Sequence, residues 1–178
     1  LAERAVLEAG GMAFRLGTLF GLGDDYSRLR LDLVINVLTY KALAERRITV
    51  FGGEQWRPIL AVRDVAAFLG EAVTREYNDV FNLSMRNIKI VDCVSVYQNI
   101  FPDLQVEIVQ TKFEDQRNYR VSTDKADAQF IFKPRISVEE EVHAMADLLR
   151  NRRIKDPLDP RYYNTHFVRA TLEDIRKF

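Results

Sequence analysis

The segment Phe51-Gly-Gly-Glu-Gln-Trp-Arg-Pro-Ile-Leu-Ala-Val-Arg-Asp-Val65 carries most of the information about the fold. Its two glycines predict a turn, and the apolar run after Arg57 predicts an extended strand. Asp64 offers a side-chain oxygen that could cap a helix beginning at Val65. An arginine beside such a turn could bind a phosphate or a carboxylate through two parallel hydrogen bonds. It could equally stack on Trp56 and serve packing alone, so the residue types leave both roles open.

The overall composition is that of a globular protein without net charge. The 178 residues suit one domain and contain 26 Lys and Arg against 26 Asp and Glu. Binding to nucleic acid or to a membrane surface gains no electrostatic support, so we expect neither partner, and any anion site must be a local cluster. The single cysteine, Cys93, excludes an internal disulfide and is expected to be packed in the core. No apolar run approaches a membrane span and nothing reads as a signal peptide, so we expect a cytoplasmic protein.

Hydrophobic periodicity predicts an α/β fold. Apolar residues at helical spacing predict helices over residues 1–9, 31–44, 65–75, 90–101 and 138–149, and a short helix near 172–178. Branched and aromatic runs predict strands within 12–21 and over 48–51, 80–83 and 105–109. Ser137 and Glu140 form a Ser-x-x-Glu pair, which predicts a capping box at the start of the fifth helix. Asn36 lies inside a predicted helix, where it lowers helix propensity without an evident local gain.

Several segments, taken in order and spacing, resemble the NAD-dependent nucleotide-sugar epimerases and dehydratases, a group of extended short-chain dehydrogenases. Residues 52–65 resemble their Gly-x-x-x-Arg-Pro-Ile/Phe-Val-x-Val-x-Asp-Val segment, and residues 12–21 resemble their Leu-Arg-x-x-x-Val-Tyr-Gly strand. Residues 30–36, Arg-Leu-Asp-Leu-Val-Ile-Asn, resemble an Arg-Phe-Asp-Leu-Val-Val-Asn helix of a subset of these enzymes. Residues 115–122 resemble their Asp-x-Arg-x-Tyr segment, and residues 132–140 resemble their Phe-x-Pro-x-x-Ser-Val-Glu-Glu helix start. The resemblance extends over roughly Leu1 to Leu149.

The resemblance implies a substrate-binding role for six residues: Thr18, Arg30, Asn36, Arg57, Arg117 and Tyr119. Arg57 would bind the diphosphate of a nucleotide sugar, and Arg117 would make a second contact to the diphosphate or ribose. Arg30 and Asn36 would point toward the substrate, and Tyr119 would pack near Arg117. Arginines that converge from separate loops make physical sense, since a diphosphate carries about two charges and accepts several hydrogen bonds.

The cofactor side of the resemblance is represented only in part. Leu16 and Gly17 occupy positions that face the nicotinamide, and Thr18 lines the sugar pocket at a position where many epimerases have asparagine. The sequence has no Gly-x-x-Gly-x-x-Gly loop after a strand and no Tyr-x-x-x-Lys pair, and it has no Cys and His at metal-ligand spacing. We therefore expect NAD or NADP to bind in a full-length parent enzyme, no cofactor to bind this chain alone, and no catalytic residue within it.

The predicted architecture is thus the C-terminal part of an extended short-chain dehydrogenase, an α/β fold without its N-terminal Rossmann half. Residues 1–24 would be a residual helix and strand of the nucleotide-binding domain, residues 25–150 the substrate-binding domain, and residues 151–178 a C-terminal arm. The expected partners are a nucleotide sugar, the missing Rossmann half and, in a homodimer, a second copy. The rival hypothesis is a non-catalytic α/β binding or assembly module, in which the same arginines contact a protein partner.

Overall fold

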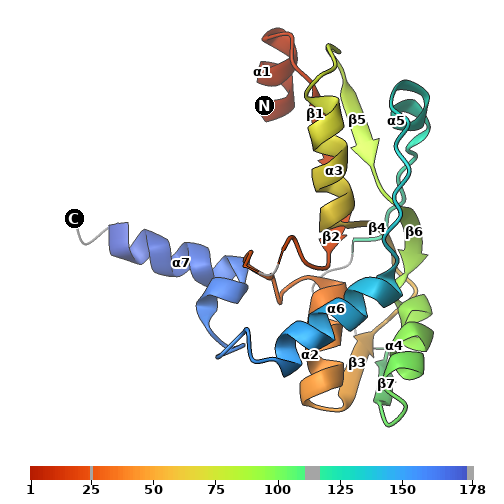
Figure 1. Ribbon diagram of the computed structural model, residues 1–178, viewed down its shortest axis with the longest axis vertical. Helices are drawn as coiled ribbons and strands as arrows, with labels where there is room; N and C mark the ends of the chain where they lie inside the picture. Colours follow the sequence, from red (N-terminus) through yellow and green to blue (C-terminus); the bar gives the residue numbers. More distant parts are fainter. Residues whose placement is uncertain (25, 111–116, 176–178) are drawn as a thin grey trace.

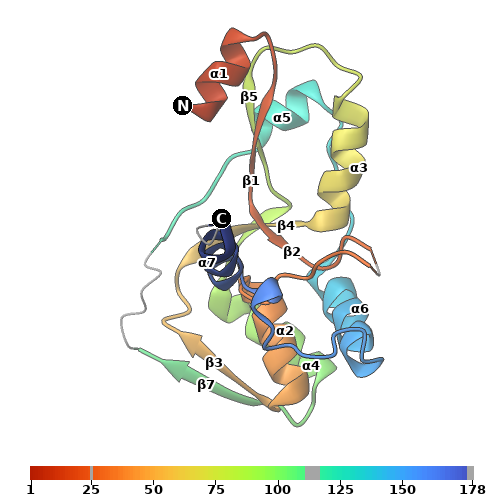
Figure 2. The same cartoon turned by 90° about the vertical axis from the view of Figure 1, so that its left-hand side faces the viewer.

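The computed structural model describes residues 1–24, 26–110 and 117–175, which form a mixed α/β fold with small sheets. Figures 1 and 2 show the strands β1 (Ala13–Leu16) and β5 (Val80–Leu83) at one end of the molecule, with the helix α3 (Val62–Ala72) beside them. The helices α2 (Val34–Ala44) and α6 (Val138–Arg150) lie at the other end. The α/β class predicted from the sequence is therefore confirmed.

The strands of the described residues form three small sheets. In the first, β1 pairs with β5 in parallel. In the second, β2 (Thr18–Phe20) pairs in parallel with β4 (Trp56–Ala61), which pairs antiparallel with β6 (Arg86–Lys89). In the third, β3 (Arg47–Phe51) pairs in parallel with β7 (Gln105–Val109). The predicted strands at 48–51, 80–83 and 105–109 are present, and the apolar run after Arg57 is a strand as expected.

The strand predicted within residues 12–21 is two strands that belong to different sheets. Gly17 separates them, and its N–H donates to Leu83 O at 2.8 Å. A Cβ at this position would lie 3.1 Å from Pro58 O, so a side chain would press against the backbone of β4. Glycine is favoured where the chain passes from β1 to β2, because a larger residue would require the backbone of β4 to move by a few tenths of an ångström.

Five of the predicted helices agree with the structure apart from their ends. The predicted helices include α1 (Ala2–Glu8) and the segment that forms η1 (Ile90–Cys93) and α4 (Val94–Ile100), and the predicted C-terminal helix lies within and beyond the end of α7 (Asn164–Ile175). The sequence did not predict α5 (Asp124–Gln129) or η2 (Pro160–Tyr162). The capping box of α6 is confirmed, since Glu140 N donates to Ser137 Oγ at 3.1 Å and Ser137 N donates to Glu140 Oε2 at 2.7 Å. The short α5 shows no hydrophobic periodicity in the sequence, because it buries the single residue Ala126 and one apolar position cannot define a period.

Three predictions about helix starts are wrong. The helix α2 begins at Val34, and Leu31 precedes it in a loop although it is fully buried. The helix α3 begins at Val62, so Asp64 lies within its first turn instead of capping it. The carboxylate of Asp64 accepts 3.2 Å hydrogen bonds from the backbone N–H groups of Arg135 and Ile136. The helix α7 begins at Asn164, and residues 176–178 of the predicted helix lie outside the described residues.

The core consists of two large clusters and a smaller one. The first cluster packs α2, α4 and α6 against the sheets and includes Ile35, Tyr97 and Val142. The second cluster is rich in aromatic rings, and its members Phe68 and Phe130 meet edge to face at a centroid distance of 5.1 Å. The third cluster contains Leu22, Leu29, Leu31, Met145 and Ile154, and it joins the loop before α2 to the C-terminal part of the chain.

Cys93 belongs to the first cluster, as expected from the sequence. It is buried, and burial raises the pKa of its thiol to about 12. The thiol is therefore protonated at neutral pH and unreactive in the folded protein. Within the described part of the chain, none of the helices has the length and apolar character that crossing a membrane would require.

A buried carboxylate connects three distant parts of the chain. Glu141, on α6, is 0% exposed; its Oε2 accepts from Leu22 N at 2.8 Å, and its Oε1 accepts from Arg63 Nε at 2.9 Å. Gly21 has φ +82°, and a Cβ there would lie 2.2 Å from Glu141 Oε2. Glycine at this position therefore provides both the left-handed backbone and the space for the carboxylate.

We predict that Glu141→Gln lowers the free energy of unfolding by about 1–3 kcal/mol, because an amide cannot accept from Leu22 and Arg63 with both of its polar atoms. Glu139→Gln is the matched control: it removes the same charge from the same helix turn, but Glu139 is exposed. We expect a change within about 0.5 kcal/mol for the control. Urea denaturation measures both values, and equal losses would show that the buried hydrogen bonds contribute nothing beyond charge.

Candidate functional site

Two adjoining pockets lie between β2, β4 and α2. The first, called the polar pocket, has a volume of about 510 Å³. Its lining includes seven of the eight residues predicted from the sequence, namely Leu16, Gly17, Thr18, Arg30, Asn36, Arg117 and Tyr119. The eighth, Arg57, lines the second pocket. Residues that are up to about a hundred positions apart in the sequence therefore meet in one region of the molecule.

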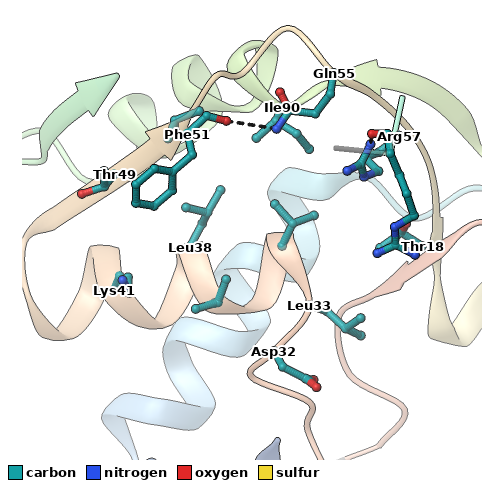
Figure 3. A pocket seen from close by; sticks show the side chains of 14 residues that line it. Thr18, Asp32, Leu33, Leu38, Lys41, Thr49, Phe51, Gln55, Arg57 and Ile90 are labelled. Carbon is teal, nitrogen blue, oxygen red and sulfur yellow. Dashed lines mark hydrogen bonds between the residues drawn. The ribbon is translucent and has the colours of Figure 1, made fainter. Parts of the chain in front are cut away.

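The second pocket, called the apolar pocket, has a volume of about 380 Å³ and is seen in Figure 3. Its walls are side chains of α2 and β3 and their neighbours: Leu33, Val34, Val37, Leu38, Val50, Phe51 and Ile90. Polar groups of Thr18, Asp32, Lys41, Gln55 and Arg57 lie around these apolar walls. The two pockets share Thr18, Leu33 and Arg117, so a ligand could extend from one into the other.

Arg57 is the second residue of β4 and is only 6% exposed. Its Nη1 donates to Trp56 O at 2.9 Å and also to Arg117 O. The guanidinium is thus fixed by backbone carbonyls of two separate segments. The Trp56 ring instead faces the cations of Arg120, 5.1 Å from its centroid, and Lys89, at 5.8 Å.

Arg30 lies in the loop before α2 and is paired with Asp32. Its Nε donates to Asp32 Oδ1 at 2.9 Å and its Nη2 donates to Asp32 Oδ2 at 3.1 Å. Burial raises the pKa of the Asp32 carboxyl, but the hydrogen bonds from Arg30 and from the Asn164 N–H outweigh this effect and hold the pKa below its usual value. Asp32 is therefore a stable anion beside the pockets at neutral pH.

Asn36 lines the polar pocket, but its side chain is also a structural link. Its Oδ1 accepts from Gly21 N at 2.9 Å, and its Nδ2 donates to Arg30 O at 2.9 Å. The local gain that the sequence did not reveal is therefore the fixation of the loop that carries Arg30. The sequence signal that could have drawn attention to this residue is an asparagine placed between apolar residues near the start of a helix.

Residues 117–119 run beside the start of β4. Asn118 Oδ1 accepts from Trp56 N at 3.0 Å, which fixes Arg117 and Tyr119 near the polar pocket. Asp115, which the sequence resemblance includes, lies outside the described residues. Sequence reasoning assigned no role to Arg28 and Lys41, which line the pockets, or to Asn118, which holds this segment against β4, since all three reach the site only through tertiary contacts.

The site residues show no arrangement for a metal ion. Among the described residues, no group of three or more His, Cys, Asp or Glu side chains could hold one. For a dinucleotide, the fit is partial: Leu16 and Gly17 line the polar pocket and could contact one end of the cofactor. The sequence provides no Gly-rich turn after a strand to receive the diphosphate of such a cofactor.

The comparisons with known proteins agree on the fold. No protein-family model matches the chain. RMD from Pseudomonas aeruginosa, solved with NADPH, has a TM-score of 0.70 and 21% identity, with 85% of this chain and 54% of that chain covered. UDP-glucuronic acid 4-epimerase from Bacillus cereus, solved with UDP-glucuronic acid and NAD, has a TM-score of 0.66 and 20% identity, with 80% and 46% covered.

A third structure, dTDP-glucose 4,6-dehydratase from Bacillus anthracis in complex with NAD, has a TM-score of 0.67 and 14% identity, with 93% of this chain and 52% of that chain covered. The chain thus spans about half the length of the solved structures it matches. This coverage is consistent with a chain that corresponds to the C-terminal half of such a protein. The chain has the fold of about half of an NAD-dependent nucleotide-sugar dehydratase or epimerase of the extended short-chain dehydrogenase type.

Proposed function

We propose that this chain is the substrate-binding portion of an NAD(P)-dependent nucleotide-sugar epimerase or dehydratase, and that it holds the nucleotide diphosphate. The observation that carries the proposal is that Arg28, Arg30 and Arg117 line one polar pocket in a chain without net charge. Such a local concentration of guanidinium groups matches a ligand with two adjacent phosphates. The Bacillus cereus epimerase that shares the fold was solved with UDP-glucuronic acid, which supports this ligand class.

The apolar pocket suits the base of the same ligand. Side chains such as Val37, Val50 and Phe51 offer apolar surface on α2 and β3, and the amide of Gln55 is held by a 3.0 Å hydrogen bond to Phe51 O. Flat heterocycles bind in such pockets, with a few polar groups at the edge providing orientation. Because Thr18 and Arg117 line both pockets, the diphosphate would lie between base and sugar.

Cofactor chemistry would come from a nucleotide-binding half that docks on β1 and α1. Among the described residues, β1 is paired with β5 on one side only. Leu1, Val6 and Leu16 expose apolar surface on or beside these two elements. An open strand edge next to apolar side chains is suited to further strands and helices. NAD or NADP held there would accept and return a hydride, while this chain binds and orients the sugar nucleotide.

We predict that the chain binds UDP-glucose and that Arg30→Lys weakens binding about tenfold, since lysine keeps the charge but cannot make the planar two-point contact with phosphate. Isothermal titration calorimetry measures both dissociation constants. Arg4→Lys serves as the control because Arg4 is an exposed arginine on α1, paired with Glu8 away from both pockets. If Arg30→Lys and Arg4→Lys bind UDP-glucose equally well, the assignment of Arg30 is wrong.

The alternative of a protein-binding module gives a different result in the same experiment. A module whose arginines contact a protein would give no saturable heat of binding with UDP-glucose. The titrations of the wild type and of Arg30→Lys would then both show only the heat of dilution. That outcome would overturn the proposed function.

Arg57→Lys is expected to differ from Arg30→Lys because Arg57 is buried and donates to two backbone carbonyls. We predict a loss of about 1–3 kcal/mol in the free energy of unfolding, together with weaker UDP-glucose binding. Arg30, whose side chain is 38% exposed, should change stability by at most about 1 kcal/mol. An unchanged melting temperature in Arg57→Lys would contradict a structural contribution of this guanidinium.

A further inference from the structure

The loop of residues 26–33, called the binding loop, contributes side chains to both pockets. Ser27, Arg28 and Arg30 line the polar pocket, and Asp32 lines the apolar pocket. The loop is fixed from the side of α2 by Asn36, whose side chain accepts from Gly21 N and donates to Arg30 O. The position of the ligand-facing arginines therefore depends on how this irregular segment is held.

The C-terminal segment of residues 151–175, called the strap, holds the same loop from its other side. Leu31 N donates to Tyr162 O at 2.8 Å, and Asn164 N donates to Asp32 Oδ2 at 2.9 Å. The Arg28 guanidinium donates to Asn164 Oδ1 and lies 4.9 Å from the centre of the Phe167 ring. Figure 1 shows α7 projecting away from α2 and α6, so the contacts with the loop are made at the N-terminal end of α7.

Packing adds to these polar contacts. Ile154 of the strap is buried in the third core cluster, and Tyr162 and Tyr163 pack against that cluster beside Leu29 and Leu31. The 3-10 turn η2 that presents Tyr162 is itself stabilised, since Arg161 N donates to Asp159 Oδ1 at 2.9 Å. The strap is thus anchored in the core before and at its contact with the binding loop.

Asp32 is the residue at which the strap and the binding arginine meet. Its Oδ2 accepts from both Asn164 N and Arg30 Nη2, while its Oδ1 accepts from Arg30 Nε. A guanidinium has five N–H groups, and this side-on pair uses two of them. The remaining edge of Arg30 keeps the geometry for a two-point contact with a phosphate.

We propose that the C-terminal strap positions the binding loop, and that Asp32 is the positioning residue that couples Arg30 to the first N–H of α7. The inference rests on the proposed function for the identity of the ligand, but the hold of the strap on the loop is independent of it. Asp32 acts through Arg30 and not on the ligand itself.

The first experiment compares Asn164→Pro with Asn164→Ala in the full chain. Both variants remove the side-chain acceptor of Arg28, and only proline removes the N–H that donates to Asp32. Proline is tolerated at the first position of a helix, and Tyr163 before it is extended at φ −126° and ψ 113°, as a residue preceding proline must be. A difference between the variants therefore reports on a single hydrogen bond.

We expect the Leu31 amide to exchange its hydrogen roughly tenfold faster in Asn164→Pro than in Asn164→Ala, as measured by NMR hydrogen exchange. With inorganic pyrophosphate as the probe, Asn164→Pro should also bind at least about threefold more weakly. Equal exchange in the two variants overturns the inference. If the wild type binds neither UDP-glucose nor pyrophosphate, the proposed function fails, and the exchange difference alone still decides whether the strap holds the loop.

The second experiment uses Asp32→Asn, which makes the site one charge more positive. If Asp32 merely competed with the ligand for Arg30, removal of its charge would tighten pyrophosphate binding. A positioning role predicts the opposite, an affinity at least about threefold weaker, with a melting temperature close to that of the wild type. Tighter binding by Asp32→Asn overturns the role assigned to Asp32.

Discussion

The fold of the site depends on one buried carboxylate, Glu141, which is paired with the half-exposed guanidinium of Arg63. Glu141 has no solvent exposure, and its carboxylate accepts from Arg63 of α3 and from the backbone of Leu22, which lies 119 positions before Glu141 in the sequence. Removal of this carboxylate is costly because the buried N–H of Leu22 would lose its acceptor and could not regain a hydrogen bond to water. The chain between β2 and α2 is thereby fixed where it leaves the sheet, before it reaches the two pockets.

From that anchored point, the arginines around the pockets divide into two kinds. Arg57 is enclosed and bonded to carbonyl oxygens of two segments, so it contributes to the scaffold as well as to the wall of the apolar pocket. Arg30 is more exposed and is paired with a carboxylate, whose side-on hydrogen bonds leave part of the guanidinium for other contacts. A neutral protein can thus concentrate positive charge locally while balancing it with carboxylates at the edge of the site.

Local patterns predicted the local structure well, and failed where the partner is distant. Ser137 and Glu140 are three residues apart, so their capping box is readable from the sequence. Leu31 fits the helical spacing of α2, but its burial comes from Met145 and Ile154, and the chain there is a loop. Asp64 has the right chemistry for a cap, but it accepts from backbone groups 71 and 72 positions away. The resemblance supplied residues that do line the pockets, whereas the second role of Asn36 depends on contacts that no spacing reveals.

The environment of Cys93 gives the protein a built-in reporter. It is the single cysteine of the chain, it is buried in the cluster between α4 and α6, and the pKa of its thiol is raised to about 12 by burial. Thiol reagents attack the thiolate, so a maleimide or a disulfide dye reacts only when this cluster opens. The rate of labelling therefore measures how often the core unfolds, with no engineered cysteine and no second cysteine to compete for the reagent.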